Sequence, residues 1–121
     1  MQYMPSVKSL KYLDGAALGK KHVGILYGDI KSDGLVQYLF IFHIYYRFKK
    51  VEDPPLFIIA SEENMMQEGP GGGSHFLCVF DDDGHSNLGQ SNDWGNRGKF
   101  FKKAVEIAEM KLGLKPSAEE N

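Results

Sequence analysis

The chain has 121 residues, of which 42% are hydrophobic, and a formal net charge of −2. This length fits one domain that buries roughly two-thirds of its unfolded surface. The charge balance excludes a general nucleic-acid-binding protein, because such proteins need a strong positive field to displace counterions. The longest apolar stretch, residues 35–46, is interrupted by Gln37 and His43 and is too short for a membrane helix.

A single cysteine, Cys78, excludes an intramolecular disulfide, which favours a reducing, cytoplasmic setting. The N-terminal residues lack the continuous apolar segment of a signal peptide. We therefore expect a soluble cytoplasmic protein with one domain over residues 1–121. Residues 1–21 are ambiguous between an amphipathic strand and a short helix, and residues 115–121 are expected to form a frayed tail.

A hairpin is predicted from residue 22 onward. Residues 22–30 alternate like a strand, Asp33 and Gly34 form a turn, and residues 35–50 form a long second strand. The two faces of that second strand differ in character. One face is expected to enter a core, and its members are Val36, Tyr38, Phe40, Phe42, Ile44, Tyr46 and Phe48. The odd-numbered residues 35–47 grade from apolar to polar, so that face is expected to be half-buried or to meet a cleft or a partner.

Two further apolar strands are predicted over residues 56–62 and 75–81, after a turn that contains Pro54 and Pro55. A glycine-rich surface connection separates them. The aspartates that end the second of these strands, with Gly84, indicate a turn into a weaker strand over residues 85–91.

The C-terminal element is predicted to be a helix over residues 97–112. Phe101, Ala104, Ala108 and Leu112 recur at spacings of three and four, and Gly113 is a strong stop signal. Asp93 or Asn96 is expected to cap its start.

These elements predict an α+β fold, with a four- to five-stranded, mostly antiparallel sheet and the C-terminal helix packed on one face. One helix covers one face, yet the strands at 56–62 and 75–81 are apolar on both. The N-terminal segment or a second copy of the chain is expected to cover the other face.

Metal and cofactor motifs are absent from the sequence. When Gly84 is aligned with the glycine of an EF-hand loop, apolar Val79 falls at the first ligand position. No HxH, HxxxH or CxxC spacing occurs. Cys78 lies within an apolar strand, which is typical of an inert buried thiol. The sequence thus predicts no metal, no cofactor and no identifiable catalytic residue.

The remaining chemistry clusters before the helix, where free backbone N–H groups, an arginine and a tryptophan suit a small anion or a partner. The leading interpretation is a non-enzymatic module that binds a protein partner or a second copy of itself. The alternative is a small enzyme or anion-binding domain, with its site near the helix N-terminus and the odd-numbered face of the second strand. The candidate binding residues for both are His43, Tyr45, His85, Asn87, Asp93, Trp94 and Arg97.

Overall fold

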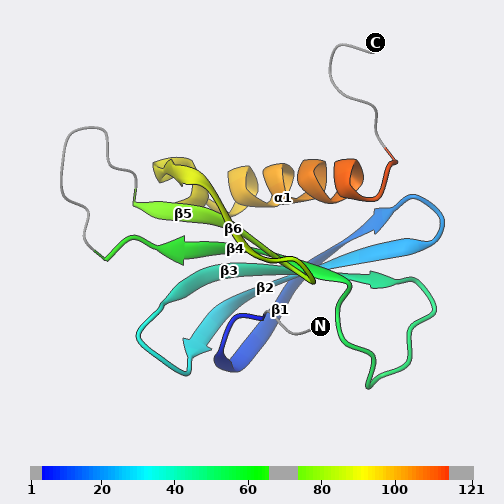
Figure 1. Cartoon of the computed structure of the whole chain (residues 1–121), viewed down its shortest axis with the longest axis horizontal. Helices are drawn as coiled ribbons and strands as arrows, with labels where there is room; N and C mark the ends of the chain where they lie inside the picture. The colour runs from blue at the N-terminus through cyan, green and yellow to red at the C-terminus, as the bar shows by residue number, and fades with distance from the viewer. Residues whose placement is uncertain (1–3, 66–73, 115–121) are drawn as a thin grey trace, which may run out of the picture.

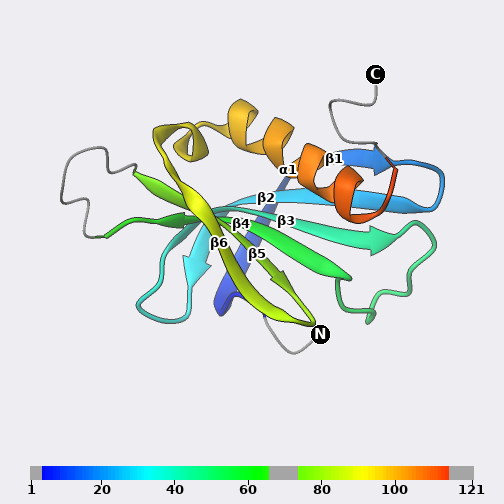
Figure 2. The same ribbon diagram turned by 45° about the horizontal axis from the view of Figure 1, so that its top comes forward.

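The computed structural model describes residues 4–65 and 74–114 of the chain. Its elements, in chain order, are β1 (Val7–Leu18), β2 (His22–Ser32), β3 (Tyr38–Tyr46), β4 (Phe57–Glu63), β5 (His75–Asp81), β6 (Gly84–Ser91), a 3-10 turn η1 (Asn92–Gly95) and α1 (Arg97–Lys111). The strands form one open antiparallel sheet in the order β1-β2-β3-β4-β5-β6, and α1 lies along one side of it (Figures 1 and 2). No helix in these two described ranges is long and apolar enough to span a bilayer.

The predicted α+β class and antiparallel pairing are confirmed, and the sheet has six strands instead of four or five. The additional strand is β1, which lies within residues 1–21, the segment that the sequence left ambiguous between a strand and a helix. Residues 66–73 of the predicted glycine-rich connection (63–74) and the predicted tail at 115–121 lie outside the described residues.

The helix-covered face of the sheet carries the larger core. Phe42 and Ile44 of β3 and Phe100 of α1 are all fully buried there. Helix α1 begins at Arg97 as predicted, and the side chain of Asn96 caps it by accepting a hydrogen bond from the backbone of Lys99.

Strand β3 is shorter than the predicted residues 35–50, so Val36 and Phe48 fall outside it and are exposed. The expected apolar row also breaks at Tyr38. A register irregularity between Tyr38 and Phe40 places Tyr38 on the face opposite the helix, where its ring meets Phe80. An inserted residue reverses the inside–outside alternation, which counting along the sequence cannot detect.

The second face has a smaller core of its own, formed by Ile41, Ile58, Ala60, Cys78 and Phe80. Val7 and Leu10 at the start of β1 and Ile30 near the end of β2 pack against this core. Strand β1 has three register irregularities, and such bulges bend a strand. The N-terminal segment therefore supplies part of the expected cover for the second face, and the start of β1 lies on the side away from α1 (Figure 1).

Candidate metal centre

Three potential metal ligands lie on the second face of the sheet, one on each of β4, β5 and β6. In the β4–β5 register Glu62 is opposite Phe76, two residues before Cys78. In the β5–β6 register His85 is opposite Phe80, two residues after Cys78. Residues two apart share a face, so Glu62, Cys78 and His85 form a diagonal row across three neighbouring strands.

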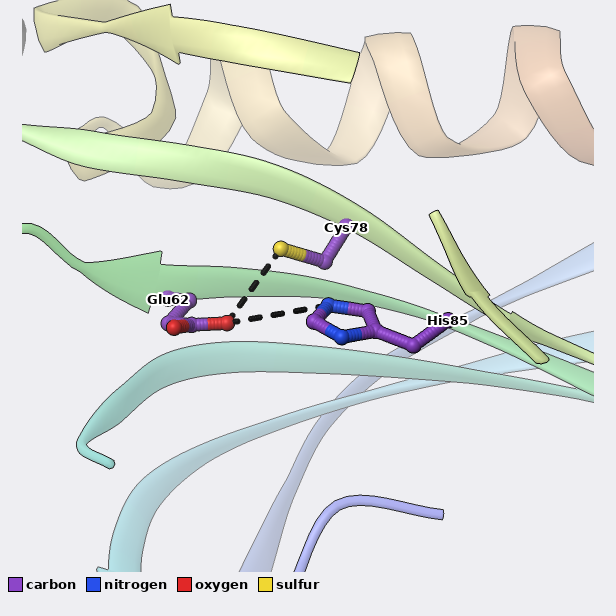
Figure 3. A group of neighbouring side chains, drawn as sticks. All are labelled: Glu62, Cys78 and His85. Carbon is purple, nitrogen blue, oxygen red and sulfur yellow. Dashed lines mark hydrogen bonds and ion pairs between the residues drawn. The ribbon is translucent and has the colours of Figure 1, made fainter. Parts of the chain in front are cut away.

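The side chains in this diagonal point toward one another (Figure 3). The Cys78 thiol donates a hydrogen bond to Oε2 of Glu62 at 3.3 Å, and Nε2 of His85 lies 3.9 Å from the same oxygen. One ligand atom from each of the three residues falls within 4.8 Å of the other two. The sheet therefore gathers one sulfur, one nitrogen and one carboxylate oxygen at a single point.

Burial varies strongly across the centre. Cys78 is fully buried, while the side chains of Glu62 and His85 are 20% and 45% exposed. The His85 ring lies parallel to the ring of Phe80, with centroids 4.5 Å apart, which holds it over β5. The thiol thus forms the floor of the centre, and the other two ligands form its solvent-facing rim.

The electrostatics around these three side chains favour a protonated thiol. Burial raises the pKa of Cys78 to about 12, and its hydrogen bond to Glu62 and the charge of that carboxylate act in the same direction. The pKa of Tyr38 is also raised to about 12, by burial and by the proximity of Glu62 and Cys78. A cation between these groups would supply the positive charge that a thiolate beside a carboxylate requires.

Two of the three separations between ligand atoms can be compared with those of a tetrahedral zinc site. Zn–S, Zn–N and Zn–O bonds of about 2.0 to 2.3 Å imply ligand–ligand separations of about 3.3 to 3.6 Å. The sulfur–oxygen distance of 3.3 Å lies at the short end of this range, and the nitrogen–oxygen distance of 3.9 Å is longer than it. A small rotation of the half-exposed His85 side chain would close the difference.

The seven residues predicted from the sequence fall into separate groups. His43 and Tyr45 occupy β3 on the second face, where Nδ1 of His43 and the Tyr45 hydroxyl lie 2.9 Å apart. Both are nearly buried, at 9% and 8% exposure. Burial lowers the pKa of His43 to about 4 and is the main cause that raises that of Tyr45 to about 12. This pair forms a hydrogen-bonded, uncharged part of the interior.

Two of the predicted residues lie on β6. His85 belongs to the candidate metal centre, while the side chain of Asn87 accepts a hydrogen bond from the backbone of Gly89, which has a φ of 115°. Asn87 is the register partner of Cys78, so it borders the centre.

Asp93, Trp94 and Arg97 lie on the helix side of the sheet. Trp94 packs against the larger core, and its backbone carbonyl accepts a hydrogen bond of 2.6 Å from buried Ser61. Asp93 pairs with Lys99 at 3.4 Å, and Arg97 donates to the carbonyl of Leu13 at 3.2 Å. The contacts with Ser61 and Leu13 tie the start of the helix to the sheet, on the face opposite the candidate metal centre.

Glu62 and Cys78 were missed as ligands by the sequence reasoning. Ligand spacing along the chain carries no signal here, because the three ligands come from three strands. The hairpin turn at Asp82 and Asp83 did hold a partial signal, since a two-residue turn fixes the register that puts Cys78 and His85 on one face.

Comparison with known proteins adds no identification to this geometry. No protein-family model matches the chain, and neither does any curated protein or any solved structure.

Proposed function

We propose that this protein binds a divalent ion of the zinc class through Glu62, Cys78 and His85. The observation that carries the proposal is the convergence of three ligand atoms from three strands within 4.8 Å. Cys78 is fully buried in the core of this face, which fixes the position of its thiol. A ligand held in place before binding lowers the ordering cost of binding.

The donor set favours zinc over the hard cations. A cysteine sulfur selects Zn²⁺ and similar ions, whereas Mg²⁺ and Ca²⁺ prefer all-oxygen sites. Histidine nitrogen and carboxylate oxygen are ordinary zinc ligands as well. Binding releases the Cys78 proton, so zinc affinity should rise with pH.

Competition with a chromophoric zinc chelator tests the proposal. We expect one zinc ion per chain, and a loss of affinity of about tenfold or more in each of Glu62→Gln, Cys78→Ser and His85→Phe. The phenylalanine retains the ring stacked on Phe80, and the glutamine retains an acceptor for Cys78.

A matched control lies on the opposite face of the same two strands. Glu63 and His75 are register partners across β4 and β5, with no cysteine between them. Glu63→Gln and His75→Gln should leave zinc affinity unchanged. The proposal would be contradicted if the zinc affinity of the three ligand variants equals that of the wild type. It would also be contradicted if the two control variants lose as much zinc affinity as the ligand variants.

A second candidate function, self-association, is favoured by the contrast between the two edges of the sheet. Edge strand β1 carries Lys8 and Lys11 and three register irregularities, which are devices that block edge-to-edge pairing. Edge strand β6 contains no lysine, arginine, aspartate or glutamate, and its Leu88 is 54% exposed. We propose that two copies pair through antiparallel β6 strands, because an uncharged edge meets its own copy without repulsion.

Sedimentation velocity separates this second proposal from the first. We expect a concentration-dependent dimer that Leu88→Lys weakens, while the matched edge substitution Ser9→Lys on β1 has no effect. A monomer at every concentration would refute the pairing and leave the zinc proposal intact.

A further inference from the structure

The three ligands of the proposed centre leave one position of a tetrahedral zinc shell unfilled by the residues that the structure describes. Structural zinc sites use four protein ligands, whereas sites with three keep a water or another exchangeable ligand in the fourth position. Cys78 closes the buried side of the centre, while Glu62 and His85 are partly exposed. A fourth ligand would therefore reach such an ion from the solvent side.

Tyr38 places a hydroxyl-bearing ring on the same face of the sheet as the three ligands. It is the register partner of Glu62 across β3 and β4, and it lies on the same face. Its ring packs edge to face against the Phe80 ring, with the two ring centroids 6.3 Å apart. Tyr38 belongs to β3 and Phe80 to β5, the strands on either side of β4. Both rings therefore lean across β4, above the small side chain of Ala60.

This placement brings a phenol O–H beside the ligands without making it one of them. Register pairing with Glu62 and the ring contact with Phe80 both place the Tyr38 ring on the face that carries the three ligands. A neutral phenol is a hydrogen-bond donor, and an anion on a metal ion is a strong acceptor.

We propose that an ion held by Glu62, Cys78 and His85 keeps one exchangeable coordination position, which takes a small anion or water that accepts a hydrogen bond from Tyr38. This inference rests on the proposed zinc binding and adds its ligand class. We expect such a position to select compact monodentate donors such as hydroxide, azide or a carboxylate oxygen, because the rings of Tyr38, Phe80 and His85 crowd together on this face.

Cobalt substitution with azide as the probe tests the inference. The Co²⁺ protein should show a thiolate-to-cobalt charge-transfer band, and azide should shift its visible bands in a saturable way. At saturating Co²⁺, Tyr38→Phe should weaken azide binding by about tenfold to a hundredfold, the value of one hydrogen bond to a charged group. The phenylalanine retains the ring against Phe80.

A matched control and three contrary outcomes make the result decisive. Tyr27→Phe removes a hydroxyl on the same face beside His43, and it should leave azide binding unchanged. If the thiolate–cobalt band is present but azide does not shift the visible bands, the exchangeable position is refuted and the metal-binding proposal is not. Equal azide affinity in Tyr38→Phe and wild type would overturn the role of Tyr38. Absence of the thiolate–cobalt band would refute metal binding itself and, with it, this inference.

Discussion

Replacement of His43 by glutamine should change how the stability of the protein depends on pH. His43 is 9% exposed, and burial lowers its pKa from 6.5 to about 4. The unfolded chain therefore takes up a proton as the pH falls through 6.5, whereas the folded protein does not do so until about pH 4. The stability linked to this residue is fully present above pH 6.5 and is lost progressively as the pH falls to 4.

The size of the loss follows from the difference between the two pKa values. A pKa change of one corresponds to about 1.4 kcal/mol, so His43 accounts for about 2 kcal/mol of lost stability by pH 5 and about 3 kcal/mol by pH 4. The variant His43→Gln has no titrating group there, and its amide retains a partner for the Tyr45 hydroxyl.

Urea unfolding of both proteins at pH 7, 6, 5 and 4, followed by circular dichroism at constant ionic strength, measures the difference directly. Other titrating groups act in both proteins and cancel. We expect the wild-type advantage over the variant to shrink by about 3 kcal/mol between pH 7 and pH 4. Parallel stability curves would refute the inference that His43 is buried in its neutral form.

Three further predictions concern packing, capping and thiol chemistry. Gly24→Ala should destabilise the protein by about 1 to 3 kcal/mol or more in urea unfolding, because the new Cβ would lie 2.0 Å from the buried ring of Phe42; unchanged stability would show that this ring can move. Asn96→Ala should lower the free energy of unfolding by about 1 kcal/mol, because the backbone N–H of Lys99 loses the side chain that caps it. An equal loss in Asn96→Gln would show that the cap requires the shorter asparagine side chain. In the metal-free protein, Cys78 should react with a thiol reagent at pH 8 at least about a hundredfold more slowly than in denaturant, since its pKa is about 12; comparable rates would contradict its burial.

Much of the fold is predictable from local patterns. The turn chemistry of Asp82, Asp83 and Gly84, the Asp33–Gly34 turn and the apolar stripe of the helix all act between residues close in sequence, and the helix begins at Arg97, where its pattern placed it. Strand β1 is harder to predict because its three register irregularities break the alternation that identifies a strand.

The candidate site is less predictable because it depends on register between strands. His85 was selected from the sequence, but its two neighbours in the centre were not, since Glu62 is 23 positions away along the printed chain. Asp93, Trp94 and Arg97 were grouped with His85 by proximity in sequence, and the reversal of the chain after β6 carries them to the helix side. Proximity along a chain predicts a shared loop, whereas a shared face needs the pairing of the strands.

X-ray absorption spectroscopy of the zinc-loaded protein tests the central claim most directly. We expect one sulfur at about 2.3 Å from the metal and nitrogen or oxygen ligands at about 2.0 to 2.1 Å, with the imidazole scattering of a single histidine. In Cys78→Ser the sulfur shell should disappear. A wild-type spectrum with nitrogen and oxygen ligands alone would contradict the centre formed by Glu62, Cys78 and His85.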